Sequence, residues 1–399
     1  MKSNPMEIEL SSVITDIAAG PFGSNLKVEC FVPEGFPIID GANLKGFTVT
    51  DNVTKFVTEE KAYSLERSIA HRGDVVSTIS GTLGQIAYIP NDSKYEGYLC
   101  SQRQFRITFD EKKVYTPYIV FYFHTREGQH KILSFASQVG VPALSQPLKN
   151  FRKIKICLPD IETQKRIASV IEALNNKIET NQKINGNLLH QALCLFAEEY
   201  VKKADVDSEL PLYDFADYIN GAAFKPDELG NTGLPVIKIA ELKAGITGST
   251  QFFSGNKGEK YLVHNKDILF SWSGNPETSI DIFVWAEGDG ILNQHTFNVK
   301  SKYSCPWFTF LLLKNNKTAF THIASNKQTT GLGHVTVADL RRLTFPFDID
   351  RMTIFEKMVT PIMDLFYYNL LENQKLSVLR DSLLPKLMSG ELDVSALEL

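Results

Sequence analysis

Two long stretches of the chain repeat their apolar positions every seven residues. The first follows Pro159 and continues to Val201 with one glycine and no proline. Apolar and asparagine side chains recur in it at alternating spacings of four and three, the pattern of a long helix that packs along another helix. At about 1.5 Å per residue it would span on the order of 60 Å, too long for one element of a compact core. The seam positions predicted for this helix are Ile167, Ile171, Leu174, Ile178, Asn181 and Leu188.

The second stretch begins after Pro346 and keeps the same period. Its predicted seam positions are Phe355, Val359, Ile362, Phe366, Asn369, Asn373, Leu376 and Leu383. Asn-Gln-Lys occurs in both stretches, at 181–183 and 373–375, and both seams place asparagine in mid-helix, where it costs stability but fixes the register. Pro361 and Pro385 each remove a backbone donor, so we expect them to weaken or kink the second helix. The pattern favours two antiparallel coiled-coil helices over two independent, solvent-exposed helices.

The segment before the first long helix predicts a mixed α/β domain. Short apolar runs alternate there with Gly, Pro and Asn, which is typical of strands joined by turns. Residues 98–109 predict a strand. Residues 116–133 predict one apolar-periodic helix, opened by Thr116-Pro117.

The same order of motifs returns after the first long helix. Each match alone is weak, but the matches keep their order and their offset drifts only slightly. The matched segments are 36–39 with 234–237, 73–81 with 266–274, Gln102 with Gln294, Phe105 with Phe297, Pro117 with Pro306, and 136–138 with 324–326. We therefore predict a duplicated fold of α/β (α+β) globular domains at 1–158 and 205–346. Two long antiparallel coiled-coil helices, at 159–204 and 347–399, would join them in a pseudo-twofold layout.

Such a layout suits an extended ligand with two separated places to touch. Duplex DNA fits because half-sites one helical turn apart lie about 34 Å from each other. The formal net charge of −4 argues against DNA binding at face value. The charge is uneven, however, since residues 1–158 hold 18 basic and 16 acidic side chains, whereas residues 346–399 hold 5 and 9. A DNA-binding chain of this kind would use a local groove or borrow positive charge from a partner.

The five cysteines are scattered, without a Cys-x-x-Cys pair. The chain has neither an apolar signal segment nor a run of about eighteen apolar residues. We expect reduced thiols in a soluble, cytoplasmic protein with no membrane contact.

The chain lacks the motifs of enzymes that act on nucleotides or DNA. It has no Gly-x-x-x-x-Gly-Lys phosphate loop. Residues 275–278, Asn-Pro-Glu-Thr, lack the aromatic platform with which a base methyltransferase would hold a flipped base. Asp160 and Lys165 are wrongly spaced for a nuclease and open a helix, where an acid favours the dipole. His190 and Cys194 have a metal-compatible spacing of four, but no second pair accompanies them. We expect no catalytic site, no metal and no cofactor in this chain.

Polar loops that both halves share are the candidates for DNA contact. Small hydroxyl residues let the backbone approach a groove, and Gln and Arg pair with adenine and guanine edges. In the first half the candidates are Lys27, Ser77, Thr78, Ser80, Thr82, Gln102, Arg103, Gln138 and Gln146. In the second half they are Lys225, Lys238, Ser271, Trp272, Ser273, Gln294, His295, Lys327, Gln328, Thr329 and His334. The lysines Lys27, Lys225 and Lys238 are expected to anchor phosphates. A structural role stays open for Gln102 and Gln294, because both halves share this glutamine.

The order of these motifs resembles the specificity (S) subunits of type I restriction–modification systems. Residues 158–168 look like the helix-opening signature of that family, an apolar-Pro pair followed by Glu-x-Gln-x-x-Ile-Ala. The likeness covers nearly the whole chain. The second copy keeps Pro346, but residues 350–352 lack the Glu-x-Gln. That departure puts in doubt only how alike the bases of the two helices are.

The resemblance implies a non-catalytic subunit whose two target-recognition domains each read one half of a bipartite, asymmetric DNA site. It also implies that the helices set the gap between half-sites and dock two methyltransferase (modification) subunits, with restriction (translocase) subunits beyond them. S-adenosylmethionine, ATP and magnesium would then belong to those partners. Residues 366–368, Phe-Tyr-Tyr, are a candidate partner surface. Two alternatives remain: a duplicated adaptor or scaffold that binds protein or another polymer, and an enzyme whose site the motifs do not reveal.

Overall fold

The computed structural model describes residues 6–137, 141–203, 208–328 and 331–395. The predicted contacts Gln138 and Thr329 lie outside these residues. The chain divides into two compact units, Met1–Leu174 with Leu379–Leu399 and Asn175–Val378. Each unit holds one globular module and a part of both long helices, α5 (Ile161–Leu195) and α11 (Ile349–Met388).

The first module is built on a four-stranded antiparallel sheet in the order β2-β10-β7-β8. A mixed sheet in the order β3-β5-β4-β9-β6 adjoins it, with β4 parallel to β9. The strands are β1 (Met6–Glu9), β2 (Ile14–Ala19), β3 (Phe31–Val32), β4 (Phe36–Ile39), β5 (Phe56–Val57), β6 (Ile69–His71), β7 (Val75–Thr78), β8 (Ile86–Tyr88), β9 (Gly97–Cys100), β10 (Gln104–Phe109), β11 (Ala136–Ser137), β12 (Ala143–Leu144) and β13 (Lys155–Leu158). The helices are α1 (Glu59–Tyr63), α2 (Thr116–His124), α3 (Arg126–Leu133) and α4 (Pro147–Arg152).

The second module repeats this plan. A four-stranded antiparallel sheet has the order β15-β23-β19-β21, and a mixed sheet has the order β17-β16-β22-β18 with β16 parallel to β22. The strands are β14 (Glu209–Pro211), β15 (Ala216–Asn220), β16 (Leu234–Ile237), β17 (Phe252–Phe253), β18 (Leu262–Val263), β19 (Ile268–Ser271), β20 (Ser273–Gly274), β21 (Asp281–Val284), β22 (Gly290–Leu292), β23 (Thr296–Ser301), β24 (Gly333–His334) and β25 (Thr344–Pro346). The helices are α6 (Ile239–Ala244), α7 (Pro276–Ser279), α8 (Pro306–Asn315), α9 (Lys317–Asn326) and α10 (Val337–Arg342). The duplicated α/β fold predicted from the sequence is confirmed.

Two element predictions in the first module were wrong. Residues 98–109 form two strands, because the chain turns at Ser101, whose carbonyl accepts from the Gln104 N–H at 3.1 Å, and passes from the mixed sheet into the four-stranded sheet. Residues 116–133 form two helices, α2 and α3. Thr125 breaks the run because its hydroxyl accepts the Gly128 N–H at 3.1 Å and caps a new helix.

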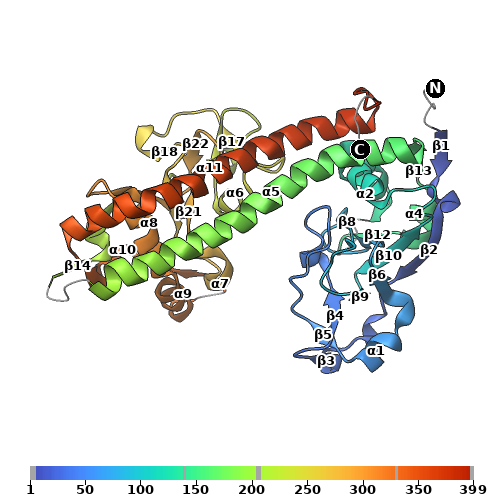
Figure 1. Cartoon of the computed structure of the whole chain (residues 1–399), viewed down its shortest axis with the longest axis horizontal. Coiled ribbons are helices and arrows are strands. Elements are labelled where there is room, and N and C mark those ends of the chain that lie inside the picture. The colour runs from blue at the N-terminus through green and yellow to red at the C-terminus, as the bar shows by residue number, and fades with distance from the viewer. Residues whose placement is uncertain (1–5, 138–140, 204–207, 329–330, 396–399) are drawn as a thin grey trace. The chain divides into compact units, whose positions relative to one another are not determined.

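The two long helices pack together, as the sequence predicted (Figure 1). In the second unit Asn181 donates to Asn373 at 2.9 Å and Asn369 donates to Asn185 at 2.8 Å, so the chain directions are opposite. In the first unit Ile171 and Leu384 share one apolar cluster. The predicted seam positions Ile167, Ile171, Ile178, Asn181, Phe355, Val359 and Asn369 are buried. The predicted positions Leu174, Leu188, Ile362, Phe366, Asn373, Leu376 and Leu383 are half-buried.

Helix α11 departs from the expected pattern in two ways. It continues through Pro361 and Pro385 without interruption, and both prolines are exposed, so the lost backbone bonds lie on the solvent side. Met363 and Tyr367 are buried although they lie off the predicted rows. The reason is a second packing face, since Glu356 of α11 accepts two backbone N–H bonds from the start of α8.

No helix within the described ranges is long and apolar enough to cross a membrane.

Candidate nucleic-acid interface

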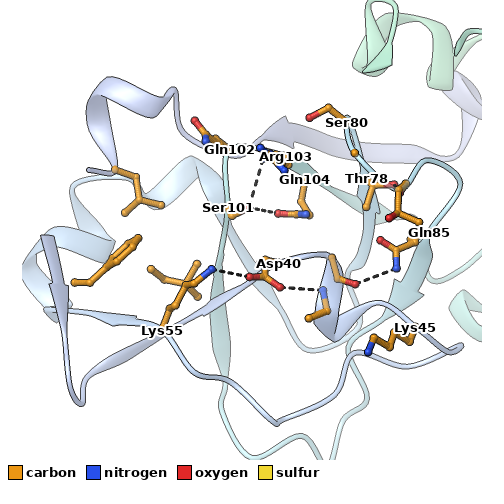
Figure 2. A pocket seen from close by; sticks show the side chains of 17 residues that line it. Asp40, Lys45, Lys55, Thr78, Ser80, Gln85, Ser101, Gln102, Arg103 and Gln104 are labelled. Atoms are coloured by element: carbon orange, nitrogen blue, oxygen red, sulfur yellow. Dashed lines mark hydrogen bonds and ion pairs between the residues drawn. The ribbon is translucent and has the colours of Figure 1, made fainter. Parts of the chain in front are cut away.

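A polar hollow of about 630 Å³ lies where strands of the two sheets of the first module end (Figure 2). The end of β4, the end of β7, the turn between β9 and β10 and the loop after β7 all contribute to it. Five predicted contact residues line it: Thr78, Ser80, Thr82, Gln102 and Arg103. The structure therefore brings together residues that the sequence separates by up to 25 positions.

The hydroxyl groups at the end of β7 hold the loop rather than point to solvent. Thr78 donates to the Thr82 carbonyl at 2.8 Å, and Ser77 donates to the Gln85 carbonyl at 3.0 Å. Ser77 and Thr78 are fully buried, whereas Thr82 is exposed. Ser77 and Thr78 thus fix the shape of the loop, and its exposed tip is what a ligand can reach.

The turn between β9 and β10 presents the other wall. Gln102 and Arg103 are both exposed, and the Arg103 carbonyl accepts the Ile79 N–H at 2.6 Å, which ties the turn to the loop after β7. Gly23 lies against the Gln102 side chain, where a Cβ atom would approach Oε1 to 2.5 Å. Within the described residues the Arg103 guanidinium has no hydrogen-bond or ion-pair partner, so its planar set of donors is available.

The charge of the hollow favours an anion. Lys45 lines it and is exposed, with no ion pair among the described residues, as is the case for Arg103. Lys55 donates to the Asp40 carboxylate at 2.9 Å (Figure 2). Burial raises the pKa of the Asp40 carboxyl, but the hydrogen bonds from Lys55 and the Ala42 N–H outweigh it, so the pKa lies below its ordinary value. Asp40 is therefore an ionised acceptor beside unpaired positive groups.

The remaining first-module candidates lie outside this lining. Lys27 is exposed at the start of a short 3-10 turn. Gln146 is exposed, with a left-handed backbone at φ 42°, immediately before α4. The segment leading to it reaches the hollow, because the Gly81 N–H donates to the Pro142 carbonyl at 3.0 Å.

Trp272 in the second module occupies the position that Ile79 has in the first, as the matched segments 73–81 and 266–274 align them. Trp272 is half-buried, and its Nε1–H donates to Asn220 at 3.1 Å. Its ring lies 5.9 Å from that of His295, whose Nε2 is 3.4 Å from the Gln294 amide nitrogen. Gln294 and His295 are exposed on the turn that corresponds to Gln102 and Arg103.

Other second-module candidates are buried or already paired. Ser271 is fully buried, and its hydroxyl has no partner in the described part of the chain. Ser273 pairs with His334 across β20 and β24. Lys327 forms an ion pair with the buried Asp339, so it is not a free cation.

Two lysines and one glutamine of the second module remain reachable from solvent. Lys225 is exposed, and no ion pair holds it among the described residues. Lys238 is half-buried and donates to Gln251 at 2.5 Å. Gln328 is exposed directly after Lys327.

Sequence reasoning missed two residues that shape these sites. Gly20 and Gly221 hold equivalent places, because a Cβ atom would come within 1.9 Å of the Ser101 carbonyl in one module and 2.1 Å of the Asn293 carbonyl in the other. The signal was a glycine in each of the two segments that precede the matched segments 36–39 and 234–237.

No group of three or more metal-ligating side chains occurs in the described ranges. The Cys194 sulfur and the His190 Nε2 atom are 3.7 Å apart on α5. Two ligands alone do not make a zinc site, which takes four.

Similarity to known proteins identifies the family. The type I restriction modification DNA specificity domain matches residues 30–190 and again residues 207–358. The chain belongs to this family. It is a DNA specificity subunit of a type I restriction–modification system, the non-catalytic component predicted from the sequence.

Individual relatives are distant. The chain is 23% identical over 374 residues to the type I restriction enzyme MjaIX specificity subunit of Methanocaldococcus jannaschii, covering 86% of this chain and 82% of that one. The crystal structure of a type I system S subunit from M. genitalium is 15% identical and covers 96% of this chain and 95% of its own, with a TM-score of 0.51. That likeness extends to the fold alone.

Proposed function

We propose that each module of this specificity subunit reads one half of a bipartite, asymmetric DNA site. The duplicated frame with unlike loop chemistry carries this proposal. Sheets of the same order present Arg103 in the first module and His295 beside Trp272 in the second. A shared frame supports the same approach to DNA, and unlike side chains support unlike bases.

The exposed candidates are the proposed contacts. Thr82, Gln102 and Arg103 in the module at 1–158, and Gln294 and His295 in the module at 205–346, are assigned to DNA because solvent reaches them. The unpaired Lys45 and Lys225 are assigned to phosphates, which position a protein on DNA without specifying sequence. The formal net charge of −4 supports a chain that binds DNA firmly only with partners.

The two long helices are proposed to set the gap between half-sites and to dock two methyltransferase subunits. On α11, Ile354, Met358, Leu365 and Tyr368 are exposed at spacings of four, seven and three. This spacing puts them on one face, opposite the buried Met363. An exposed apolar stripe of this kind is typical of a protein interface, and in a specificity subunit the modification subunits are the partner it serves.

The chemistry is assigned to the partners. S-adenosylmethionine would bind the methyltransferase subunits, and ATP and magnesium the restriction subunits. In this proposal the specificity subunit selects the place at which they act.

Mapping of methylated sites by long-read sequencing tests the proposal. DNA would come from cells that carry this chain with its methyltransferase subunit. We expect one bipartite motif, one half of which changes when residues 1–158 are exchanged with those of a relative and the other half when residues 205–346 are exchanged. A methylation pattern that does not depend on this chain would contradict the proposal.

A further inference from the structure

Asp40 and Lys238 occupy the same place in the two modules. Each follows the strand that pairs in parallel with its neighbour, β4 with β9 and β16 with β22. Each also opens a helical turn in the same way, since the Asp40 N–H donates to the Asn43 side chain at 3.1 Å and the Lys238 N–H donates to the Glu241 side chain at 3.0 Å. The matched segments 36–39 and 234–237 thus continue for one further residue.

The residues that face these two positions are equivalent as well. The Ile38 N–H donates to the Lys55 carbonyl at 2.9 Å, and the Val236 N–H donates to the Gln251 carbonyl at 2.8 Å. In the first module Lys55 donates to Asp40 at 2.9 Å, whereas in the second Lys238 donates to Gln251 at 2.5 Å. The strand end therefore offers an acceptor in one module and a donor in the other.

Asp40 lies inside the polar hollow with Arg103, and its carboxylate has free acceptor capacity (Figure 2). A carboxylate has about four acceptor positions. The Ala42 N–H and Lys55 occupy one position on each oxygen. The remaining positions can accept from a ligand in the hollow.

Formation of the turn does not require a carboxylate at this position. The second module makes the equivalent turn with Lys238, through the Glu241 side chain that corresponds to Asn43. The facing residue changes as well, from Lys55 to Gln251, so either charge finds a partner at this position. Selection of different bases would explain why the two modules differ in charge here.

We propose that these two positions determine base identity in their half-sites, an inference that rests on the function proposed above. Asp40 accepts a hydrogen bond from the exocyclic amino group of cytosine or adenine. Lys238 donates to the acceptor atoms of guanine or thymine, so it reads a base instead of anchoring a phosphate.

Selection of bound duplexes from a pool with random half-sites tests the inference. The chain would be assembled with its methyltransferase subunits and S-adenosylmethionine, and the bound duplexes sequenced. Asp40→Asn keeps the size of the side chain, and the double variant Asp40→Lys with Lys55→Gln gives the first module the pair of the second. Lys238→Met tests the second module separately. Asp16→Asn is the matched control, because that carboxylate is paired with Arg106 at 2.6 Å and does not line the hollow.

We expect Asp40→Asn to lower the preference for an amino-bearing base at one position of one half-site by at least about fivefold. The double variant should favour guanine or thymine at that position. Lys238→Met should relax one position of the other half-site only, and Asp16→Asn should leave the motif unchanged. If the wild-type motif appears but these variants select the same motif, this inference is wrong while the proposed function stands. If the wild-type complex selects no motif, the proposed function itself is wrong.

Discussion

The Asn369 side chain donates a hydrogen bond to the Oδ1 atom of Asn185 at 2.8 Å, across the pair of long helices. Both side chains are buried, and the Asn185 amide donates in turn to the Phe366 carbonyl at 3.0 Å. A polar pair in an otherwise apolar seam stabilises only the register in which its members meet. In a subunit whose helices are proposed to set a distance on DNA, that register fixes the distance.

Asn369→Ala should lower the free energy of unfolding by about 1–3 kcal/mol, because Asn185 Oδ1 is left buried without its donor. Urea denaturation of the full chain would measure the loss. The double variant Asn185→Leu with Asn369→Leu should recover much of the stability while making the register less specific. Asn187→Ala, an exposed position on α5, is the control and should change stability by less than about 0.5 kcal/mol. A loss as large at Asn187 would contradict the role given to the buried pair.

Gly20→Ala should destabilise the first module by about 1–3 kcal/mol, because the added methyl group overlaps the Ser101 carbonyl. It should also displace the turn that carries Gln102 and Arg103, and so weaken recognition of one half-site. Gly221→Ala should act on the other half-site through Asn293. Melting temperatures together with methylation mapping separate the two effects. Gly46→Ala has no atom within 4 Å of the new methyl group and should affect neither readout.

The long helices and the duplication could be predicted because their patterns appear in the sequence itself, without knowledge of three-dimensional contacts. A seven-residue period needs no knowledge of the partner, and the order of matched motifs survives small insertions. The burial of Met363 could not be predicted, because it depends on where α8 packs against α11. The break at Thr125 had a local signal, a threonine three residues before Gly128, but the apolar run that precedes it, at 117–123, masked it.

The burial of the candidate contact residues was harder to predict than the helices and strands. Ser77, Thr78 and Ser271 were chosen by residue type, yet all three are buried, because β7 and β19 are inner strands covered on both faces. Lys327 was chosen for its charge, yet it forms an ion pair with Asp339. Asp40 was not among the predicted contacts, because its equivalence to Lys238 is visible only when the strands of the two modules are compared.

The half-buried His124 predicts acid sensitivity of the first unit. Burial lowers the pKa of His124 below its ordinary value, and the Arg380 charge acts in the same direction, against the hydrogen bond to the Ile86 carbonyl. The unfolded chain therefore takes up the proton first, so stability falls as the pH drops below about 6.5. Between pH 7 and pH 5 the free energy of unfolding should decrease, and His124→Gln should flatten this slope. His322→Gln, at an exposed position on α9, should leave the slope unchanged.

Arg103 and Lys45 line the same hollow, but replacing them should affect DNA binding in different ways. Arg103→Gln should relax one base of the recognised half-site, because the guanidinium donors fit a base edge. Lys45→Gln should keep the motif but reduce the slope of log K against log salt concentration by about 0.9, the loss of one phosphate contact. Titration of a duplex with the mapped motif at several salt concentrations measures both. Equal changes in motif and slope for the two variants would contradict this division of roles.

Leu365 lies at the centre of the exposed stripe on α11, and its replacement tests the docking of methyltransferase subunits. Leu365→Glu should weaken assembly by at least about tenfold, because a charge would have to be desolvated in an apolar interface. The fold of the specificity subunit should be unaffected, since the Leu365 side chain is 48% exposed. Sedimentation of the chain with and without methyltransferase subunits, beside a thermal melt, gives both quantities. Gln182→Glu on α5 adds the same charge at an exposed position away from the stripe and should assemble normally. If the Leu365 variant also assembles at wild-type affinity, the partners dock elsewhere, and the stripe then requires another occupant.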